Sequence, residues 1–389
     1  MTYENDYSIP KEVLEQICEE GFDALPDLIR IMLNTAMQIE RHKHLGAGPY
    51  ERTPERRGYA NGYKPKTVST RVGKIALDVP QVREGDFYPN SLEKGLRSER
   101  ALKLALAEMY VQGVSTRKVA AITERMCGFS VSSSQVSKAT AELDEQLQAW
   151  RDRPLGHTKY LYLDARYEKV RQEGQVRDAA VLLAVGVNHE GKREVLGVSV
   201  SLGEHEVHWR SFLQRLVARG LSGVELIISD AHSGIKRATR AVFGGVPWQR
   251  CQCHLQRNAQ AYVPRQSMKA TVASDIRAIF NAPDRQEADA LLKKTVAKYA
   301  QDAPRLSSWM EENLPEGLTV FAFPQKHRRL IRTTNGLERL NREIRRRSRV
   351  ASLFPNEASC LRLATAVVME ISEDWQTGRA YIRWESDSE

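Results

Sequence analysis

The sequence is short of cysteine and of long apolar runs. Its 389 residues include five cysteines, an odd and scattered set at positions 18, 127, 251, 253 and 360. Such a set is not typical of a disulfide framework and favours a reducing compartment. The longest apolar run, AAVLLAVGV at 179–187, is too short to span a bilayer, and the N-terminus lacks the basic-then-apolar order of a signal peptide. We therefore predict a cytoplasmic protein that does not bind a membrane.

Positive charge is present in excess but is unevenly distributed. The net charge is +9, yet residues 51–74 hold seven Lys or Arg against two Glu, and residues 325–349 hold ten against two. The remainder of the chain is therefore slightly acidic. Concentrated positive charge of this kind predicts contact with nucleic acid. A solvated basic face remains the alternative interpretation.

Residues 1–98 are predicted to form an N-terminal DNA-binding region of helices and a basic loop or hairpin. Two helical segments in 10–45 break near Gly21 and Pro26, and a stretch rich in Gly, Pro and Arg follows them. Tyr59 and Tyr63 stand between basic residues there, a mixture suited to backbone contact and base stacking. The DNA-contacting candidates in this region are Arg57, Asn61, Lys64, Lys66 and Arg71.

Residues 99–150 are predicted to form three helices, the second from Thr116 to about Met126 and the third from about Ser133 to 148. The segment GVSTRKVAAITERMCGFSVSSSQVSKAT resembles a helix-turn-helix, in which the last helix would present Ser134, Gln135 and Lys138 to a major groove. A purely structural three-helix bundle remains an alternative, because helix pairs are common.

From residue 157 the pattern predicts an α/β domain. Strands are expected at 158–164, 178–188, 193–201 and 224–230, with a short fifth in VPWQRC, and helices follow the third and fourth strands. This order is the ribonuclease H-like plan. It places Asp164 and Asp230 at the C-terminal ends of neighbouring parallel strands, where open α/β sheets present their sites. Paired carboxylates favour a hard divalent cation, Mg²⁺ or Mn²⁺, although a single strand-end Asp is usually a turn or cap residue.

We predict that 155–255 and 326–380 form this catalytic domain and that 256–325 form an all-helical insertion. Within it, Trp309 is expected to be a core residue. Cys251, Cys253 and His254 lie close in sequence just before the insertion. They offer three ligands where a closed zinc site needs four, so we do not favour a zinc site.

Several segments, in order, resemble the mutator-type bacterial insertion-sequence transposases. They are ERRGYANGY, MYVQGVSTRKV, YLYLDARYEKV, LIISDAHSGIKRA, WQRCQCHLQRN and TTNGLERLNREIRRRSRVASLFPN. The resemblance implies a DDE triad of Asp164, Asp230 and Glu338, with two Mg²⁺ or Mn²⁺ ions per active site. It implies that Cys251 and His254 orient the fold near the site without binding metal. His232 is expected either to contact a substrate phosphate or to cap its helix.

The basic helix at 333–349 contains two candidate glutamates. At 100° per residue, Leu337, Leu340 and Ile344 lie on the core face, and Glu338 and Glu343 lie on opposite flanks. Geometry allows either to be catalytic, and only the resemblance selects Glu338. Glu343 is expected to form an ordinary helix ion pair. The expected contacts to the DNA backbone are Arg342, Arg345, Arg346 and Arg349.

The leading hypothesis is a DNA transposase that cleaves to free a 3′-OH and then catalyses strand transfer. The resemblance implies double-stranded DNA as partner, with terminal inverted repeats and a target, a homodimer or higher assembly on DNA, and a nucleoid location. One alternative is a ribonuclease H-like nuclease that hydrolyses without joining. Another is a non-enzymatic helix-turn-helix regulator, which leaves the acidic strand ends unexplained.

Overall fold

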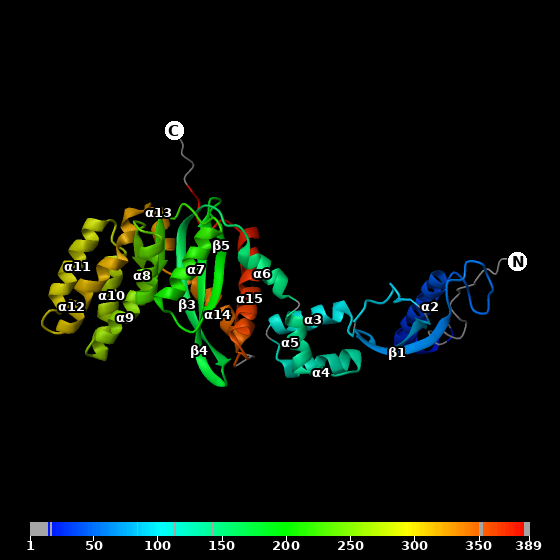
Figure 1. The fold of residues 1–389 in the computed structure, drawn as a ribbon. Coiled ribbons are helices and arrows are strands. Elements are labelled where there is room, and N and C mark those ends of the chain that lie inside the picture. Colours follow the sequence, from blue (N-terminus) through cyan, green and yellow to red (C-terminus); the bar gives the residue numbers. More distant parts are fainter. Residues whose placement is uncertain are drawn as a thin grey trace. The chain divides into compact units, whose positions relative to one another are not determined.

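A computed structural model describes residues 15, 18–83, 85–95, 97–112, 114–141, 143–349 and 353–384. The chain divides into two compact units, Met1–Leu143 and Asp144–Glu389 (Figure 1). This confirms a mixed α/β protein. The finer division into four regions stays a prediction. In the described part of the chain, no helix has the length and apolarity needed to cross a membrane.

In the first unit a long helix packs on a hairpin. A short 3₁₀ turn, η1 (Gly21–Ala24), leads into α2 (Leu25–Leu45), and β1 (Ala60–Thr70) pairs antiparallel with β2 (Gly73–Val82). The core between helix and hairpin consists of Met37, Val68, Ile75, Leu77, Val79 and Leu92. The predicted hairpin is thus confirmed, and so is the predicted break near Gly21 and Pro26, because η1 interrupts the helix and α2 begins at Leu25 with Pro26 in its first turn. Proline is tolerated in the first turn of a helix, where its missing N–H has no partner to lose; most of the expected segment before Gly21 lies outside the described residues.

Three more helices complete the first unit: α3 (Arg100–Val111), α4 (Thr116–Cys127) and α5 (Ser133–Ala141). Their shared core includes Leu102, Leu106, Val119 and Val136. Met126, near the end of α4, lies outside this core and is 74% exposed. The predicted third helix is in fact two, since α6 (Asp144–Asp152) is separate from α5.

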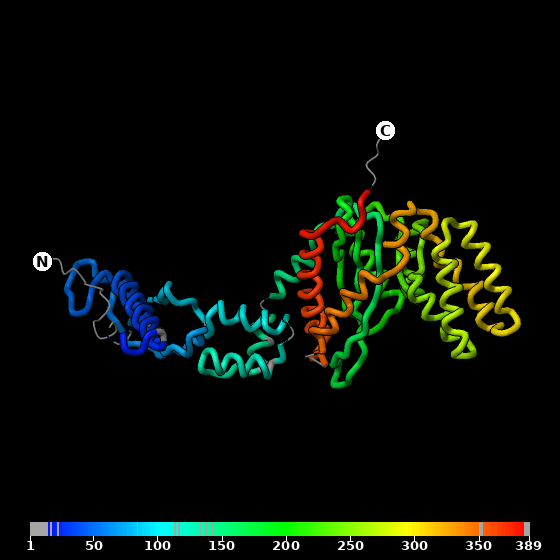
Figure 2. Tube along the Cα trace, turned by 180° about the vertical axis from the view of Figure 1, so that it is seen from behind, coloured from blue at the N-terminus to red at the C-terminus, as the bar shows by residue number. Residues whose placement is uncertain are grey.

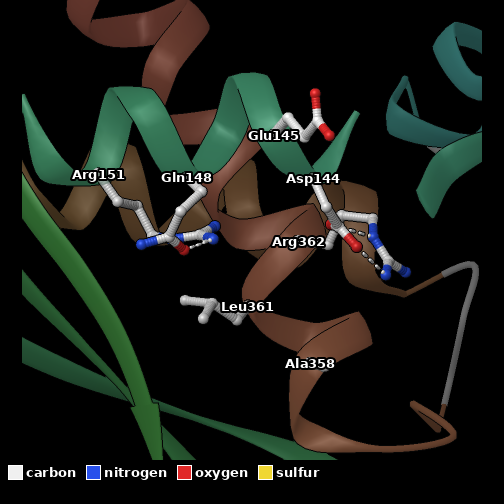
Figure 3. Close-up of a pocket in the computed structure, with 7 residues that line it drawn as sticks. All are labelled: Asp144, Glu145, Gln148, Arg151, Ala358, Leu361 and Arg362. Atoms are coloured by element: carbon white, nitrogen blue, oxygen red, sulfur yellow. Dashed lines mark hydrogen bonds and ion pairs between the residues drawn. The ribbon is translucent and has the colours of Figure 1, made fainter. Parts of the chain in front are cut away.

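Helix α6 belongs to the second unit because it is bound to a C-terminal helix, α15 (Glu357–Thr377). Arg362 donates two hydrogen bonds, each 2.7 Å long, to the two carboxylate oxygens of Asp144 (Figure 3). Arg151 donates to Thr365 Oγ1 at 3.0 Å. A two-pronged Arg–carboxylate contact is geometrically specific, so it fixes how α6 lies on α15.

The second unit is built on a mixed five-stranded sheet with the order β5-β4-β3-β6-β7. The strands are β3 (Thr158–Gln172), β4 (Gln175–Asn188), β5 (Arg193–Ser201), β6 (Leu226–Ser229) and β7 (Trp248–Arg250). Strands β3, β4 and β5 are antiparallel neighbours, whereas β6 is parallel to β3 and β7 is parallel to β6. All five predicted strands are present.

Helices cover both faces of this sheet (Figures 1 and 2). On one face, α7 (Glu206–Ala218) and α8 (Ser233–Val242) bury Trp209 and Ile235 against Leu161 and Leu163. Side chains alternate along a strand, so Tyr160 and Tyr162 turn to the other face. That face carries α13 (Gln325–Ile331), α14 (Asn335–Ser348) and α15.

The segment between β7 and α13 is helical, as predicted. It contains α9 (Gln252–Ala259), α10 (Lys269–Phe280), α11 (Arg285–Tyr299) and α12 (Pro304–Asn313), together with the 3₁₀ turns η2 (Gln260–Tyr262), η3 (Gln266–Met268), η4 (Leu314–Gly317) and η5 (Thr319–Ala322). Trp309 is 9% exposed and its ring stacks on Tyr262 at 5.4 Å. This confirms the prediction that Trp309 is a core residue.

Candidate active site

Asp164 and Asp230 each lie two residues beyond the last paired residues of the parallel strands β3 and β6. Tyr160 pairs with Leu226, and Tyr162 with Ile228, so the next residue on the same face of each chain is the aspartate. The expectation that β3 ends at Asp164 is wrong. The strand continues to Gln172 because β4 goes on pairing with it after β6 has ended. The aspartates therefore stand where the parallel pairing stops and the sheet opens.

The two aspartates influence each other electrostatically. Burial raises the pKa of Asp164 to about 7, and the negative charge of Asp230 adds to that rise. The hydrogen bond from the Ala165 backbone N–H and the positive charge of His254 act in the opposite direction. A buried carboxylate beside a second carboxylate is an environment that a cation would stabilise.

Asn341 connects Asp164 to the basic helix α14. Its side-chain Nδ2 donates to Asp164 Oδ2 at 2.7 Å, while Asp164 Oδ1 accepts from the Ala165 backbone N–H at 3.0 Å. Both oxygens of Asp164 are thus held. The Asn341 Oδ1 atom is buried and has no partner among the described residues. Sequence reasoning missed Asn341, although it lies one helical turn after Glu338 and so marks the same side of α14.

Glu338 lies in the first turn of α14, one turn before Asn341. Its side chain is 40% exposed, and its Oε1 is 3.9 Å from Arg257 on α9. The Glu338 charge also contributes to raising the pKa of Cys253, whose rise comes first from a hydrogen bond with Cys251. Within the described ranges, no three His, Cys, Asp or Glu side chains are grouped so that they could hold a metal ion.

The start of α14 is held by Cys251, which is fully buried. Its sulfur accepts from the backbone N–H and the hydroxyl of Thr334, each at 3.4 Å, and Thr334 directly precedes α14. Hydrogen bonds from Cys253, His254 and Thr334 lower the pKa of the Cys251 thiol to about 3, against the effect of burial. The hydrogen bond to Cys251 and the charges of the two aspartates raise the pKa of His254 to about 9.

His232 caps α8. Its Nδ1 accepts from the Gly234 backbone N–H at 3.3 Å, and it lies 3.7 Å from Glu204. Of the two expected roles, the structure thus contains the cap. Contact with a phosphate stays a prediction.

The two glutamates of α14 have different surroundings. Glu343 accepts hydrogen bonds from Arg346 and Arg347, and these hold its pKa at about 2. This confirms the expected helix ion pair. Arg347 is buried and also donates to both oxygens of Glu370 on α15, at 2.7 and 3.0 Å. The helix therefore anchors its far end to α15 through an arginine that sequence reasoning did not single out.

The predicted DNA-contacting residues of the first unit are mostly exposed. Arg57, Asn61 and Lys64 lie on its surface. Arg71 forms an ion pair with Glu99 at 3.1 Å, and Lys66 donates to Tyr88 at 2.8 Å. Their role stays a prediction.

In α5, Ser134, Gln135 and Lys138 are exposed. The Gln135 side chain accepts from the Ser132 backbone N–H at 2.7 Å, and Ser132 Oγ accepts in return from the Gln135 N–H at 3.2 Å. This reciprocal pair is a capping box. It gives Gln135 a structural role at the start of α5 that the sequence interpretation did not consider.

On α14, Arg342, Arg345, Arg346 and Arg349 are exposed. Arg346 is bonded to Glu343 through three hydrogen bonds. Its contact with DNA stays a prediction, as do those of the other three.

Comparison with known proteins finds one family along nearly the whole chain. A family model described as "Transposase, Mutator family" matches residues 7–378. The transposase for insertion sequence element IS406 of Burkholderia multivorans is 58% identical over 370 residues, which cover 95% of each chain. The transposase for element ISRM5 of Rhizobium meliloti is 46% identical over 92% of this chain and 90% of its own length.

A third relative, the transposase for element IS256 in transposon Tn4001 of Staphylococcus aureus, is 36% identical over 97% of this chain and 98% of its own length. Among solved structures, a chain of the simian T-cell lymphotropic virus intasome in complex with PP2A regulatory subunit B56 gamma covers 50% of this chain and 67% of that one. Its 15% identity and TM-score of 0.18 are too low to carry an argument.

Proposed function

This chain belongs to the Mutator family of transposases, and we propose that it is the DNA transposase of an insertion sequence. It binds the terminal inverted repeats, cleaves to free a 3′-OH and joins that end to target DNA. The observation that carries this proposal is that Asp164 and Asp230 each lie two residues beyond the last paired residues of β3 and β6, at the opening of the sheet. The strand order of that sheet supports a ribonuclease H-like core with a helical insertion.

The donor chemistry at the aspartates suits a hard divalent cation. Their carboxylates are oxygen ligands, and the raised pKa of Asp164 reflects a burial cost that a cation would offset. Asp164, Asp230 and Glu338 would hold two Mg²⁺ or Mn²⁺ ions, which when bound supply activation of the attacking oxygen and of the scissile phosphate. Glu338, on α14, would complete this set, although it is not grouped with the two aspartates among the described residues.

The chain's own residues position that set. Asn341 orients the Asp164 carboxylate by donating to its Oδ2. Cys251 holds the N-terminal end of α14 through Thr334, so it fixes the position of the helix that carries Glu338 and Asn341. A misplacement of about 1 Å at a reacting centre costs on the order of 10²-fold in rate, so these contacts matter to a cleavage reaction even though neither touches DNA.

DNA binding is distributed over both units in this proposal. The helices α4 and α5 of the first unit act as a helix-turn-helix, with Ser134 exposed in the first turn of α5 and Lys138 exposed in its last turn. The basic hairpin adds phosphate contacts. Two copies or more assemble on paired ends, in the cytoplasm and on the nucleoid.

The test replaces Asp164 by Asn and uses Asp178→Asn as the matched control. Asp178 lies on β4, is exposed and pairs with Lys169 at the surface. With Mg²⁺ and a labelled duplex of an element end, D164N should lose cleavage while D178N keeps it, and both should bind the duplex as the unchanged protein does. Cleavage by D164N at the unchanged rate would refute the catalytic assignment.

Two further measurements separate the alternatives. A pre-cleaved end with a free 3′-OH should be joined to target DNA; hydrolysis without joining would instead identify a nuclease. Specific duplex binding without any Mg²⁺-dependent cleavage would identify the non-enzymatic regulator.

A further inference from the structure

Arg193, the first residue of β5, is held in an unusual way. Its guanidinium lies 4.2 Å from the ring centre of Trp375 and 4.5 Å from that of Tyr381. Aromatic contacts of this kind use the flat faces of a guanidinium. The N–H groups point outward in its plane, and no hydrogen bond or ion pair from this side chain to another described residue is found. The stack therefore fixes the arginine and leaves its donors for a ligand.

Two further arginines stand beside it. Arg339 and Arg342, both exposed on α14, line one cavity of about 500 Å³ together with Arg193. The positive charge of Arg339 contributes to lowering the pKa of Arg193, after the larger effect of burial. Like charges placed together cost free energy unless an anion offsets them. We call these three residues the arginine groove.

The acidic side chains in the same cavity do not neutralise the arginine groove. Glu343 and Glu370 are both bonded to Arg347, and Glu343 is bonded to Arg346 as well. Asp374 is the remaining carboxylate of the lining. The three arginines of the groove therefore face one carboxylate, that of Asp374, and the cavity keeps a net positive charge. Arginine donors in a fixed plane match the paired oxygens of a phosphate.

We propose that the arginine groove binds the phosphate backbone of duplex DNA. This rests on the proposed function for its ligand, and it adds Arg193 and Arg339 to the residues that hold DNA. Helical rotation places Arg342 on the flank of Glu338, but the structure places it in the groove with Arg339 and Glu343. Since Arg339 directly follows Glu338, a backbone seated in the groove lies along the helix that carries the proposed third carboxylate.

The experiment measures duplex affinity at several salt concentrations, in EDTA, for Arg339→Gln and Arg342→Gln. Each phosphate contact contributes about 0.9 to the slope of log affinity against log salt. Each variant should therefore lower the magnitude of the slope by about one. The matched control is Arg210→Gln, which removes the same charge from α7 on the other face of the sheet, where Arg210 is exposed and forms an ion pair with Glu206. It should leave the slope unchanged.

Arg193 is tested by a pair of variants, because its loss also removes the aromatic contacts. Arg193→Gln should lower the slope as the α14 variants do, and Arg193→Lys, which keeps the charge, should restore it. Equal slopes for R339Q, R342Q and R210Q, whether lowered or unchanged, would overturn the proposal. Because no metal and no cleavage enter this measurement, its outcome is independent of whether D164N abolishes cleavage.

Discussion

Replacing Asn341 by Ala should slow DNA cleavage without weakening DNA binding. The substitution removes the amide that donates to Asp164 Oδ2 at 2.7 Å and leaves α14 otherwise intact, because alanine favours helix. Asp164 keeps only the Ala165 N–H at its other oxygen. Its carboxylate would then be free to rotate away from the position opposite Asp230.

The size of the effect follows from that one contact. A hydrogen bond to a charged group contributes about 1.5–3 kcal/mol. At about 1.36 kcal/mol per factor of ten, its loss predicts a rate lower by roughly 10- to 100-fold. A full loss of activity is not expected, because the substitution leaves all three proposed carboxylates in place.

The assay is single-turnover cleavage of a labelled element end, with protein in excess and Mg²⁺ present, so that binding does not limit the rate. Glu343→Gln is the control on the same helix, since Glu343 lies on the opposite flank and Arg347 keeps its contact with Glu370. A cleavage rate for N341A within about threefold of that for E343Q would refute the reasoning, because one charged hydrogen bond accounts for more than that.

The remaining predictions concern the third carboxylate and the C-terminal segment. Glu338→Gln should abolish cleavage in the same assay while E343Q retains it; equal loss in the two variants would mean that the helix rather than the carboxylate is required. Gly191→Ala should destabilise the protein by about 2 kcal/mol more than Gly174→Ala in urea unfolding. Both positions have positive φ, +75° and +79°, and share the left-handed strain of about 1–2 kcal/mol. A Cβ at 191 would lie 1.7 Å from Ile382 O, whereas none lies within 4 Å at 174. The clash would also break two backbone hydrogen bonds to Gly191 O, at about 1 kcal/mol each; equal unfolding midpoints would contradict this.

The strands of the sheet could be predicted from the sequence because the central strands are buried and apolar. Residues 179–187 are all buried, and their run of small and branched side chains is typical of a strand covered on both faces. The core face of α14 could also be predicted, because its apolar residues follow a regular pattern. Leu337, Leu340 and Ile344 recur at helical spacing and are each at most 1% exposed.

The length of β3 could not be predicted from the sequence, because the second half of the strand lacks a buried, apolar pattern. Residues 165–172 are largely polar, and they remain in a strand because each of them pairs with a residue of β4, from Leu182 back to Gln175. Strand pairing of this kind depends on the partner rather than on the segment itself. The sequence therefore located Asp164 correctly beside Asp230 while misplacing the end of its strand.

Contacts between distant residues were also beyond sequence reasoning. Asn341 and Asp164 are 177 positions apart, and no local pattern links an amide on one to a carboxylate on the other. The Arg193 stack likewise joins the start of β5 to Trp375 and Tyr381 near the C-terminus. A single arginine at the start of a strand produces no periodic pattern in the sequence. The arginine groove could therefore be identified only in the folded structure, where β5 packs beside α14 and α15.

The basic helix α14 can hold a carboxylate because its two ends are fixed independently of its charges. Cys251 and Thr334 fix the first turn, and the buried Arg347 fixes the last turn to Glu370 on α15. With the helix held in this way, its exposed arginines are not needed to neutralise Glu338, which forms an ion pair with Arg257 on α9. In the function proposed above, the carboxylate and the arginines then serve different parts of one DNA substrate, the carboxylate at the scissile phosphate and the arginines along the backbone beside it.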